Sequence, residues 1–173
     1  MKKLLIILVA ILSLIILAGC GEKEPDGIIT LYPGNDTVEL GTIWQDGGAK
    51  VTIDNVDYDM TTNDTVDPTR TGIYEIHYSY IDQSDEYNTT RYVVVVDQTP
   101  PTVTLRPGID TIKVGEEWID AWVDFTDNAN EPLIPVVTGS VDNTTPGTYE
   151  IIYTLTDYSG NSTSVTRYVT VVD

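Results

Sequence analysis

Three clustered aspartates are the residues of this chain best suited to bind a metal ion. Asp54, Asp57 and Asp59 fall in the segment DNVDYD. Ca²⁺ takes about six to eight oxygen ligands, which carboxylates and amide carbonyls supply. The spacing is not that of an EF-hand loop, and Asp and Asn also form turns by bonding their own backbone. Two interpretations stay open for this loop, a Ca²⁺ site and a plain turn, and no other cofactor is expected.

The single histidine, His77, does not mark an active site. It lies in a run of alternating apolar and polar residues, on the face opposite Tyr78, and this face is expected to point outward. A Ser-His-Asp site needs an oriented acid and an exposed nucleophile, and no pattern in the chain marks either. We therefore predict that the protein is not an enzyme.

The composition excludes several other classes of function. The chain has 27 acidic and 9 basic side chains, a formal net charge of −18 and one cysteine. Nucleic-acid binding needs clustered Lys and Arg that contact phosphates, so no nucleic acid is expected as a partner. A lone cysteine excludes an intrachain disulfide, a thiolate zinc site and a Cys-x-x-Cys redox pair.

The N-terminus has the order of features of an export signal. A basic start is followed by an apolar run over residues 4–17, which is shorter than the roughly 20 residues of a transmembrane helix. Small residues before Cys20 resemble the bacterial lipobox. The resemblance implies a signal peptide over residues 1–19, and acyl chains such as palmitate that hold the Cys20 thiol at a membrane. An uncleaved helical anchor is the alternative, and both place the folded part outside the cytoplasm, at a bacterial surface or envelope. The motif of the cleavage site is Leu17, Ala18, Gly19.

The remaining chain contains a tandem repeat of one domain-sized unit. Residues 30–44 read TLYPGNDTVELGTIW, and residues 104–118 read TLRPGIDTIKVGEEW. Two adjacent prolines between the repeats favour an extended, semi-rigid connection. The expected organisation is a tether over 20–26, a first domain over 27–98, a linker over 99–102 and a second domain over 103–173.

Alternating hydrophobicity within each unit predicts strands. Turn residues interrupt the runs at intervals typical of β-sandwiches, and no stretch has a helical period. The fold class expected is all-β, with two tandem sandwiches. The residues expected to face the two cores are Tyr74, Ile76, Tyr78, Tyr80, Val93 and Val95, with Tyr149, Ile151, Tyr153, Leu155, Val169 and Val171.

Several motifs sharpen this fold prediction. The segment GTYEI at 147–151 is similar to the entry into strand F of an immunoglobulin-like sandwich, where a tyrosine often forms a tyrosine corner. DYSGN at 157–161 precedes the final strand. Together with the Pro-Pro link, these motifs resemble the bacterial immunoglobulin-like domains named from an insecticidal crystal protein, relatives of the hyalin-repeat-like domains. The resemblance implies an extracellular module used in arrays, and it does not imply a reaction.

Two weaker candidate sites lie in the second unit. Asp127, Asn128 and Glu131 occupy the loop that corresponds to the aspartate cluster. Trp122 has no counterpart in the first unit, and an exposed Trp can stack on a sugar or anchor a protein contact. We therefore expect a non-catalytic, surface-anchored lipoprotein that acts in binding or adhesion. Its expected partners are the membrane, through a lipid anchor at Cys20, and a cell-wall glycan or a surface protein. A spacer or stalk that presents a partner protein is the alternative function.

Overall fold

The structure is a computed structural model that describes residues 26–173. It is all-β and consists of two sandwiches, as the alternating sequence pattern predicts. Nowhere in the described part does the chain form a helix long and apolar enough to cross a membrane.

The first sandwich has two three-stranded sheets. One sheet has the order β1-β3-β4, with the strands Gly27–Leu31, Ala49–Ile53 and Val56–Asp59. The other has the order β2-β6-β5, with the strands Thr37–Glu39, Asp85–Val96 and Gly72–Asp82. The short β2 pairs in parallel with the end of β6, whereas β5 and β6 form a long antiparallel hairpin.

The second sandwich repeats this plan with a different division of strands. A two-stranded sheet pairs β7 with β9, over Thr102–Leu105 and Val123–Thr126. The larger sheet has the order β10-β11-β12-β8, with the strands Val136–Thr138, Gly147–Thr156, Ser162–Val172 and Thr111–Lys113. The parallel pairing of β8 with β12 matches that of β2 with β6.

Strand alternation places the predicted residues in the cores. Ile76 and Val93 are fully buried in the first sandwich, and Tyr153 and Val169 in the second. On β5 the residues between the buried ones point outward, and His77, between Ile76 and Tyr78, is therefore exposed. Burying one Val or Ile side chain stabilises by about 1.5–3 kcal/mol, which is why register is strongly specified on these strands.

A tyrosine corner lies at the start of β5 and again at the start of β11. The Tyr74 hydroxyl donates to the carbonyl oxygen of Arg70 at 2.8 Å. The Tyr149 hydroxyl donates to the carbonyl of Thr145 at the same distance. The corner expected from the sequence is therefore present in both units, and it fixes the loop that leads into each long hairpin.

Each core also holds a buried arginine. The Arg167 side chain is 1% exposed, and it donates to both carboxylate oxygens of Asp110 at 2.9 and 3.0 Å. It also donates to the carbonyl oxygens of Arg106 and Trp122. Arg91 repeats the arrangement with Asp36. These ion pairs tie the loop before β2 or β8 to the last strand of the same sandwich.

A tyrosine hydroxyl lies beside each buried arginine. Tyr153 donates to Asp120 at 2.6 Å, and Tyr78 donates to Asp46. Burial, followed by the bond to the neighbouring aspartate, raises the pKa of Tyr153 to about 12. Burial and the bond to Asp46 likewise raise the pKa of Tyr78 to about 12. Both hydroxyls therefore stay protonated donors at neutral pH.

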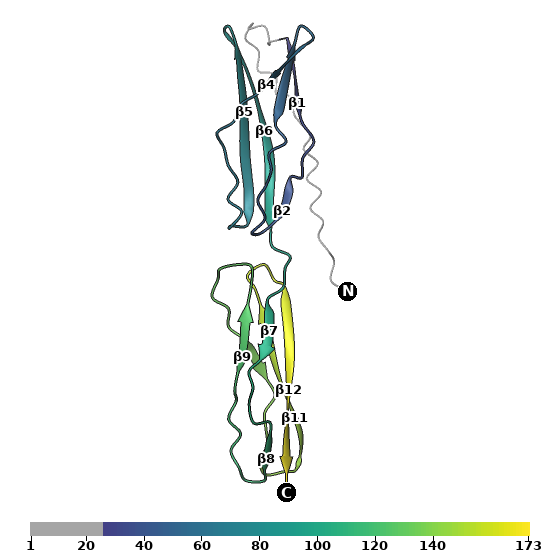
Figure 1. Ribbon diagram of the computed structural model, residues 1–173, viewed down its shortest axis with the longest axis vertical. Coiled ribbons are helices and arrows are strands. Elements are labelled where there is room, and N and C mark those ends of the chain that lie inside the picture. The colour runs from purple at the N-terminus through teal and green to yellow at the C-terminus, as the bar shows by residue number, and fades with distance from the viewer. Residues whose placement is uncertain (1–25) are drawn as a thin grey trace, which may run out of the picture.

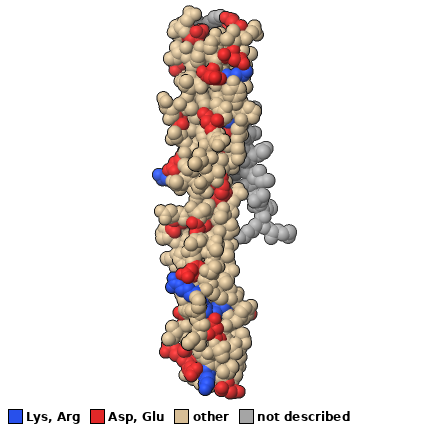
Figure 2. All heavy atoms as spheres, viewed as in Figure 1, with Lys and Arg blue, Asp and Glu red and all other residues tan. Residues whose placement is uncertain are grey.

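The two sandwiches lie end to end along the long axis of the molecule (Figure 1). The strand β6 runs down into the connection to β7, and the C-terminus lies at the end of the second sandwich away from the first. Acidic side chains are spread along the whole visible length of this rod, and basic ones are few (Figure 2). Any site that depends on both sandwiches must therefore lie at their junction.

Candidate functional site

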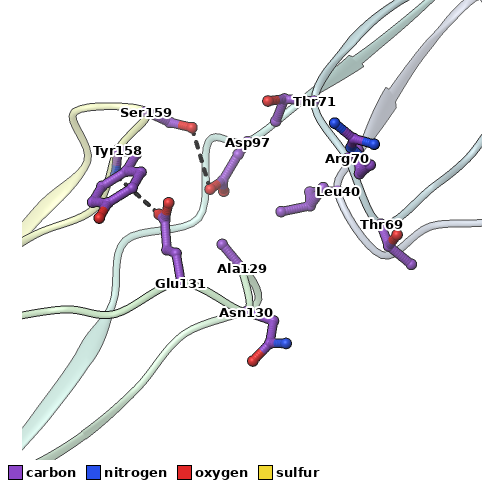
Figure 3. Close-up of a pocket in the computed structure, with 10 residues that line it drawn as sticks. All are labelled: Leu40, Thr69, Arg70, Thr71, Asp97, Ala129, Asn130, Glu131, Tyr158 and Ser159. Carbon is purple, nitrogen blue, oxygen red and sulfur yellow. Dashed lines mark hydrogen bonds between the residues drawn. The ribbon is translucent and has the colours of Figure 1, made fainter.

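The junction between the sandwiches encloses a groove of about 470 Å³. Residues of the first sandwich lie on one side of it and loops of the second on the other, with Asp97 between them (Figure 3). The apolar contact across it is made by Ala129, which packs against the cluster of Val38, Leu40 and Val95. The residues that line the groove are Leu40, Thr69, Arg70, Thr71, Asp97, Ala129, Asn130, Glu131, Tyr158 and Ser159.

Asp97 is the residue that joins the two sides. It directly follows β6 and is only 8% exposed. Its Oδ1 accepts from the Asn128 side chain at 3.1 Å, and its Oδ2 accepts from the Ser159 hydroxyl at 3.4 Å. Its backbone carbonyl accepts from the Asn161 side chain at 3.1 Å. Three residues of the second sandwich thus hold the residue that follows the last strand of the first.

The linker is held from the first sandwich as well. Glu39 Oε1 accepts from the backbone N–H of Gln98 and from the Thr99 hydroxyl, each at 2.8 Å. The Thr99 N–H donates to Asp97 Oδ1 at 3.2 Å. The connection is therefore hydrogen-bonded on both sides.

Asp97 meets two further carboxylates, those of Asp127 and Glu131. One oxygen of each of the three lies within 4.8 Å of the others, the one such group among residues 26–173. Glu131 Oε1 accepts from the Tyr158 N–H at 3.0 Å, and Asp127 Oδ2 from the Ala129 N–H at 3.3 Å. The other Asp127 oxygen, Oδ1, is buried and accepts no hydrogen bond. We call these three side chains the junction carboxylates.

Asp157 lies in the neighbouring DYSGN loop. It is 4% exposed and accepts from both the backbone N–H and the side chain of Asn161. Because Asn161 also donates to the Asp97 carbonyl, this motif positions the loop against the junction. The motif that carried the family resemblance thus has a structural role here.

The aspartates predicted as a Ca²⁺ site are arranged differently. Only Asp54 and Asn55 form a turn, with φ of 51° and 63°, and residues 56–59 form β4 instead of a loop. Two left-handed residues suit the tight turn of a hairpin, which explains why the chain reverses there. Asp57 pairs with Lys50 at 2.5 Å and accepts from Thr52 at 2.7 Å. The structure does not bring Asp54, Asp57 and Asp59 into one group, whereas it does so for two of the three weaker candidates, Asp127 and Glu131.

Trp122 is 37% exposed, and its ring packs edge-on against Tyr153 with centroids 5.9 Å apart. Its φ of 70° is held by a hydrogen bond from its N–H to Asp120 and by the bond from Arg167 to its carbonyl. About a third of the residue stays accessible, so contact with a ligand remains a prediction.

His77 lies on the outer face, where its Nδ1 is 2.8 Å from Asp64. The backbone N–H of His77 donates to the same Asp64 oxygen and, with the ring contact, lowers the pKa of that carboxyl. Cys20 and the cleavage motif Leu17, Ala18 and Gly19 lie outside the described residues.

Asp97 is the site residue that sequence reasoning missed. The expected domain bounds place it next to the end of the first domain, and the available signal is its position directly after a strand of inward-facing valines. The partners that give it a role lie 30 or more residues away, at Asn128 and beyond.

Comparison with known proteins agrees with the fold. Residues 109–171 match a family described as bacterial surface protein, Ig-like domain. No curated protein matches the chain. The match supports a non-catalytic role at a bacterial surface, and the second sandwich is similar to the Ig-like domains of bacterial surface proteins.

Proposed function

We propose that the protein is a non-catalytic lipoprotein of the bacterial surface that acts as a stiff spacer. The observation that carries this proposal is the junction, where Glu39 holds the linker from one side and Asn128 and Asn161 hold Asp97 from the other. Linked domains that are joined only by a flexible segment move independently by default. A connection hydrogen-bonded from both sides keeps two end-to-end sandwiches in line (Figure 1).

The reach of such a spacer follows from the strands. The longest strand, β6, has 12 residues, which is roughly 40 Å at about 3.3 Å per residue. Two sandwiches end to end therefore hold the C-terminal tip roughly 80 Å from the start of the first strand. Attachment through acyl chains on Cys20 would place that start near the membrane.

Energy transfer from a C-terminal fluorophore to acceptors in the membrane tests the spacer on cells. The wild type should show low transfer. A variant with Gly and Ser in place of residues 98–101 should show higher transfer, because its second sandwich can fold back. Equal transfer in the two proteins would count against a stiff spacer.

The anchor is tested separately. Cys20→Ala should lose a metabolically incorporated palmitate label and leave the membrane fraction. A variant that keeps both the label and the fractionation would exclude lipidation at this residue.

A binding or adhesion role is the second candidate, and the edge strand β10 favours it. All three of its residues are exposed, Val136 at 62%, and Ile134, two residues before the strand, is 82% exposed. An exposed apolar edge strand can pair with an added strand of another protein. Screening against glycans, cell-wall material and surface proteins, with Val136→Lys as the comparison, tests this role. Binding that the lysine removes would favour adhesion through β10.

A further inference from the structure

We propose that the junction carboxylates, Asp97, Asp127 and Glu131, bind one divalent cation, with Ca²⁺ as the best match. The inference goes beyond the spacer role and stands on the geometry of the junction alone. It places a ligand between the two sandwiches, whereas the sequence pattern placed its weaker candidate, Asp127, Asn128 and Glu131, within the second unit alone.

The spacing of the three oxygens fits a single ion. Ca²⁺ lies about 2.3–2.6 Å from its oxygen ligands, so two ligands of one ion are at most about 5 Å apart. One oxygen from each carboxylate lies within 4.8 Å of the others. Their pairwise spacing is therefore compatible with ligation of one shared ion.

A buried oxygen without a partner is the second observation. Asp127 Oδ1 has no contact with solvent and accepts no hydrogen bond, although its twin Oδ2 accepts from Ala129. A buried acceptor that is left unsatisfied costs about 1–3 kcal/mol, and more when it carries charge. Such groups in folded proteins call for a specific cause, and an ion is one of them. A cation at Asp127 would supply the missing partner.

Charge leads to the same conclusion. Asp97 is 8% exposed, lies beside two other carboxylates, and pairs with no Lys, Arg or His within the described chain. Arg70 lines the same groove but lies across it from Glu131, and forms no ion pair with the group (Figure 3). Asp127 and Glu131 are only partly exposed, and like charges held this close to a buried carboxylate are unfavourable unless an opposite charge compensates them. A divalent cation would offset two of the three charges.

The donor atoms select the kind of cation. The group contains carboxylates only, without a histidine or cysteine of the type that zinc and copper prefer. Mg²⁺ needs shorter bonds and near-octahedral geometry, and it retains several waters. Ca²⁺ accepts irregular oxygen sites, which suits three carboxylates drawn from a strand end and a loop.

The first sandwich provides an internal comparison. Its corresponding cluster has its carboxylates spread over a hairpin, and Lys50 already compensates Asp57. No strand end from a preceding unit contributes to it among the described residues. Substitutions at Asp54 and Asp59 thus change the charge equally without touching the proposed site.

Calcium titration of the full-length protein tests the proposal. The protein is purified in detergent because of its apolar N-terminal run, and it is stripped with a chelator. Isothermal titration calorimetry should then give one Ca²⁺ per chain, with a Kd at or below about 1 mM, as in extracellular modules. Thermal unfolding should show a Tm that rises with Ca²⁺ and much less with equal Mg²⁺, because a ligand that binds only the folded state stabilises it.

Matched variants assign the site. Glu131→Gln retains an oxygen for the Tyr158 N–H, and Asp127→Asn retains the shape of the side chain. Each should weaken Ca²⁺ binding at least tenfold and reduce the Tm rise. For Asp54→Asn and Asp59→Asn, the Kd for Ca²⁺ should stay within about twofold of the wild-type value. These two variants lose the same charge as Glu131→Gln and Asp127→Asn, but they lose it away from the proposed site. Circular dichroism in chelator verifies that each variant is folded.

Two outcomes would overturn the proposal. The first is a wild-type protein that takes up no Ca²⁺ at about 10 mM, well above the weakest extracellular sites. The second is an equal loss of binding in all four variants, which would mean diffuse attraction to an acidic surface. Neither outcome bears on the spacer, which is tested by energy transfer.

Discussion

Replacing Arg167 with alanine should destabilise the second sandwich much more than any exposed charge does. The guanidinium is 1% exposed and makes four hydrogen bonds, two to Asp110 and one each to the carbonyls of Arg106 and Trp122. Breaking a buried pair costs about 3–5 kcal/mol when one charge is left behind. In the variant, water can solvate Asp110, because this side chain is 37% exposed. The Trp122 carbonyl still accepts a hydrogen bond from the backbone N–H of Arg106. The expected loss is therefore at the lower end, about 3 kcal/mol.

Urea unfolding measures this loss. A Trp44→Phe background leaves Trp118 and Trp122 as reporters of the second sandwich. With a slope of about 1.5 kcal/mol/M for a unit of this size, a loss of about 3 kcal/mol lowers the midpoint by about 2 M. Arg106→Ala is the control, because its ion pair with Asp124 is half exposed and is expected to contribute less than about 1 kcal/mol.

The reasoning would be refuted by equal midpoints for the Arg167 and Arg106 variants. That result would mean that desolvation of the buried guanidinium cancels its four bonds. The buried Nε of Arg167, which has no partner, is the feature that would contribute to such a cancellation.

Three further predictions concern the second sandwich. Tyr149→Phe removes the hydroxyl bond of the tyrosine corner and should cost about 1 kcal/mol by urea unfolding, whereas no change would make the corner incidental. Because the pKa of Tyr153 is raised from 10.0 to about 12, the folded state holds this proton more tightly, so stability should be full below pH 10 and fall as pH rises toward 12. Tyr153→Phe should be less sensitive over that interval, and an unchanged slope between pH 9 and pH 11 would contradict the assignment. Gly139→Ala would place a Cβ 2.0 Å from a carbonyl oxygen of β11 and should prevent folding, whereas Gly115→Ala, at a similar positive φ in open space, should cost only about 1 kcal/mol by thermal unfolding.

Alternation and repetition were enough to predict the cores. The inward set on β5 and β6 followed from a period of two, because each strand has one solvated face. The all-β class is confirmed for the described residues, and so are the tyrosine corners. These features depend on local geometry. Because the same local pattern recurs in both units, the prediction for one unit can be checked against the other.

The buried arginines could have been found by the same reasoning. Arg91 shares its face with Val93 and Val95, and Arg167 has the same relation to Val169 and Val171. A charged residue on an inward face needs a buried partner, and Asp36 and Asp110 recur at equivalent positions. The signal in the sequence is the Arg-Tyr pair that begins the last apolar run of each unit, at 91–92 and 167–168.

The grouping of Asp97 with Asp127 and Glu131 could not be found in this way. Asp97 lies at the end of one unit, and Asp127 and Glu131 lie in a loop of the next. No period or motif relates them, because their distance depends on how two separately folded sandwiches dock. The stronger acidic pattern in the sequence, DNVDYD, instead encodes a hairpin whose charges pair locally with Lys50.

Docking also explains how two related units acquire different surfaces. Leu40 in the first unit corresponds to Val114 in the second, one residue after equivalent edge strands. Leu40 is 7% exposed because its cluster is covered by Ala129 across the junction, whereas Val114 is 43% exposed. In a chain of repeats, stability is the sum of what each unit contributes alone and what each interface adds. The apolar contact at Leu40, the bonds to Asp97 and the proposed cation all belong to the interface. Weakening any of them should therefore change the coupling between the two sandwiches before it changes the fold of either one.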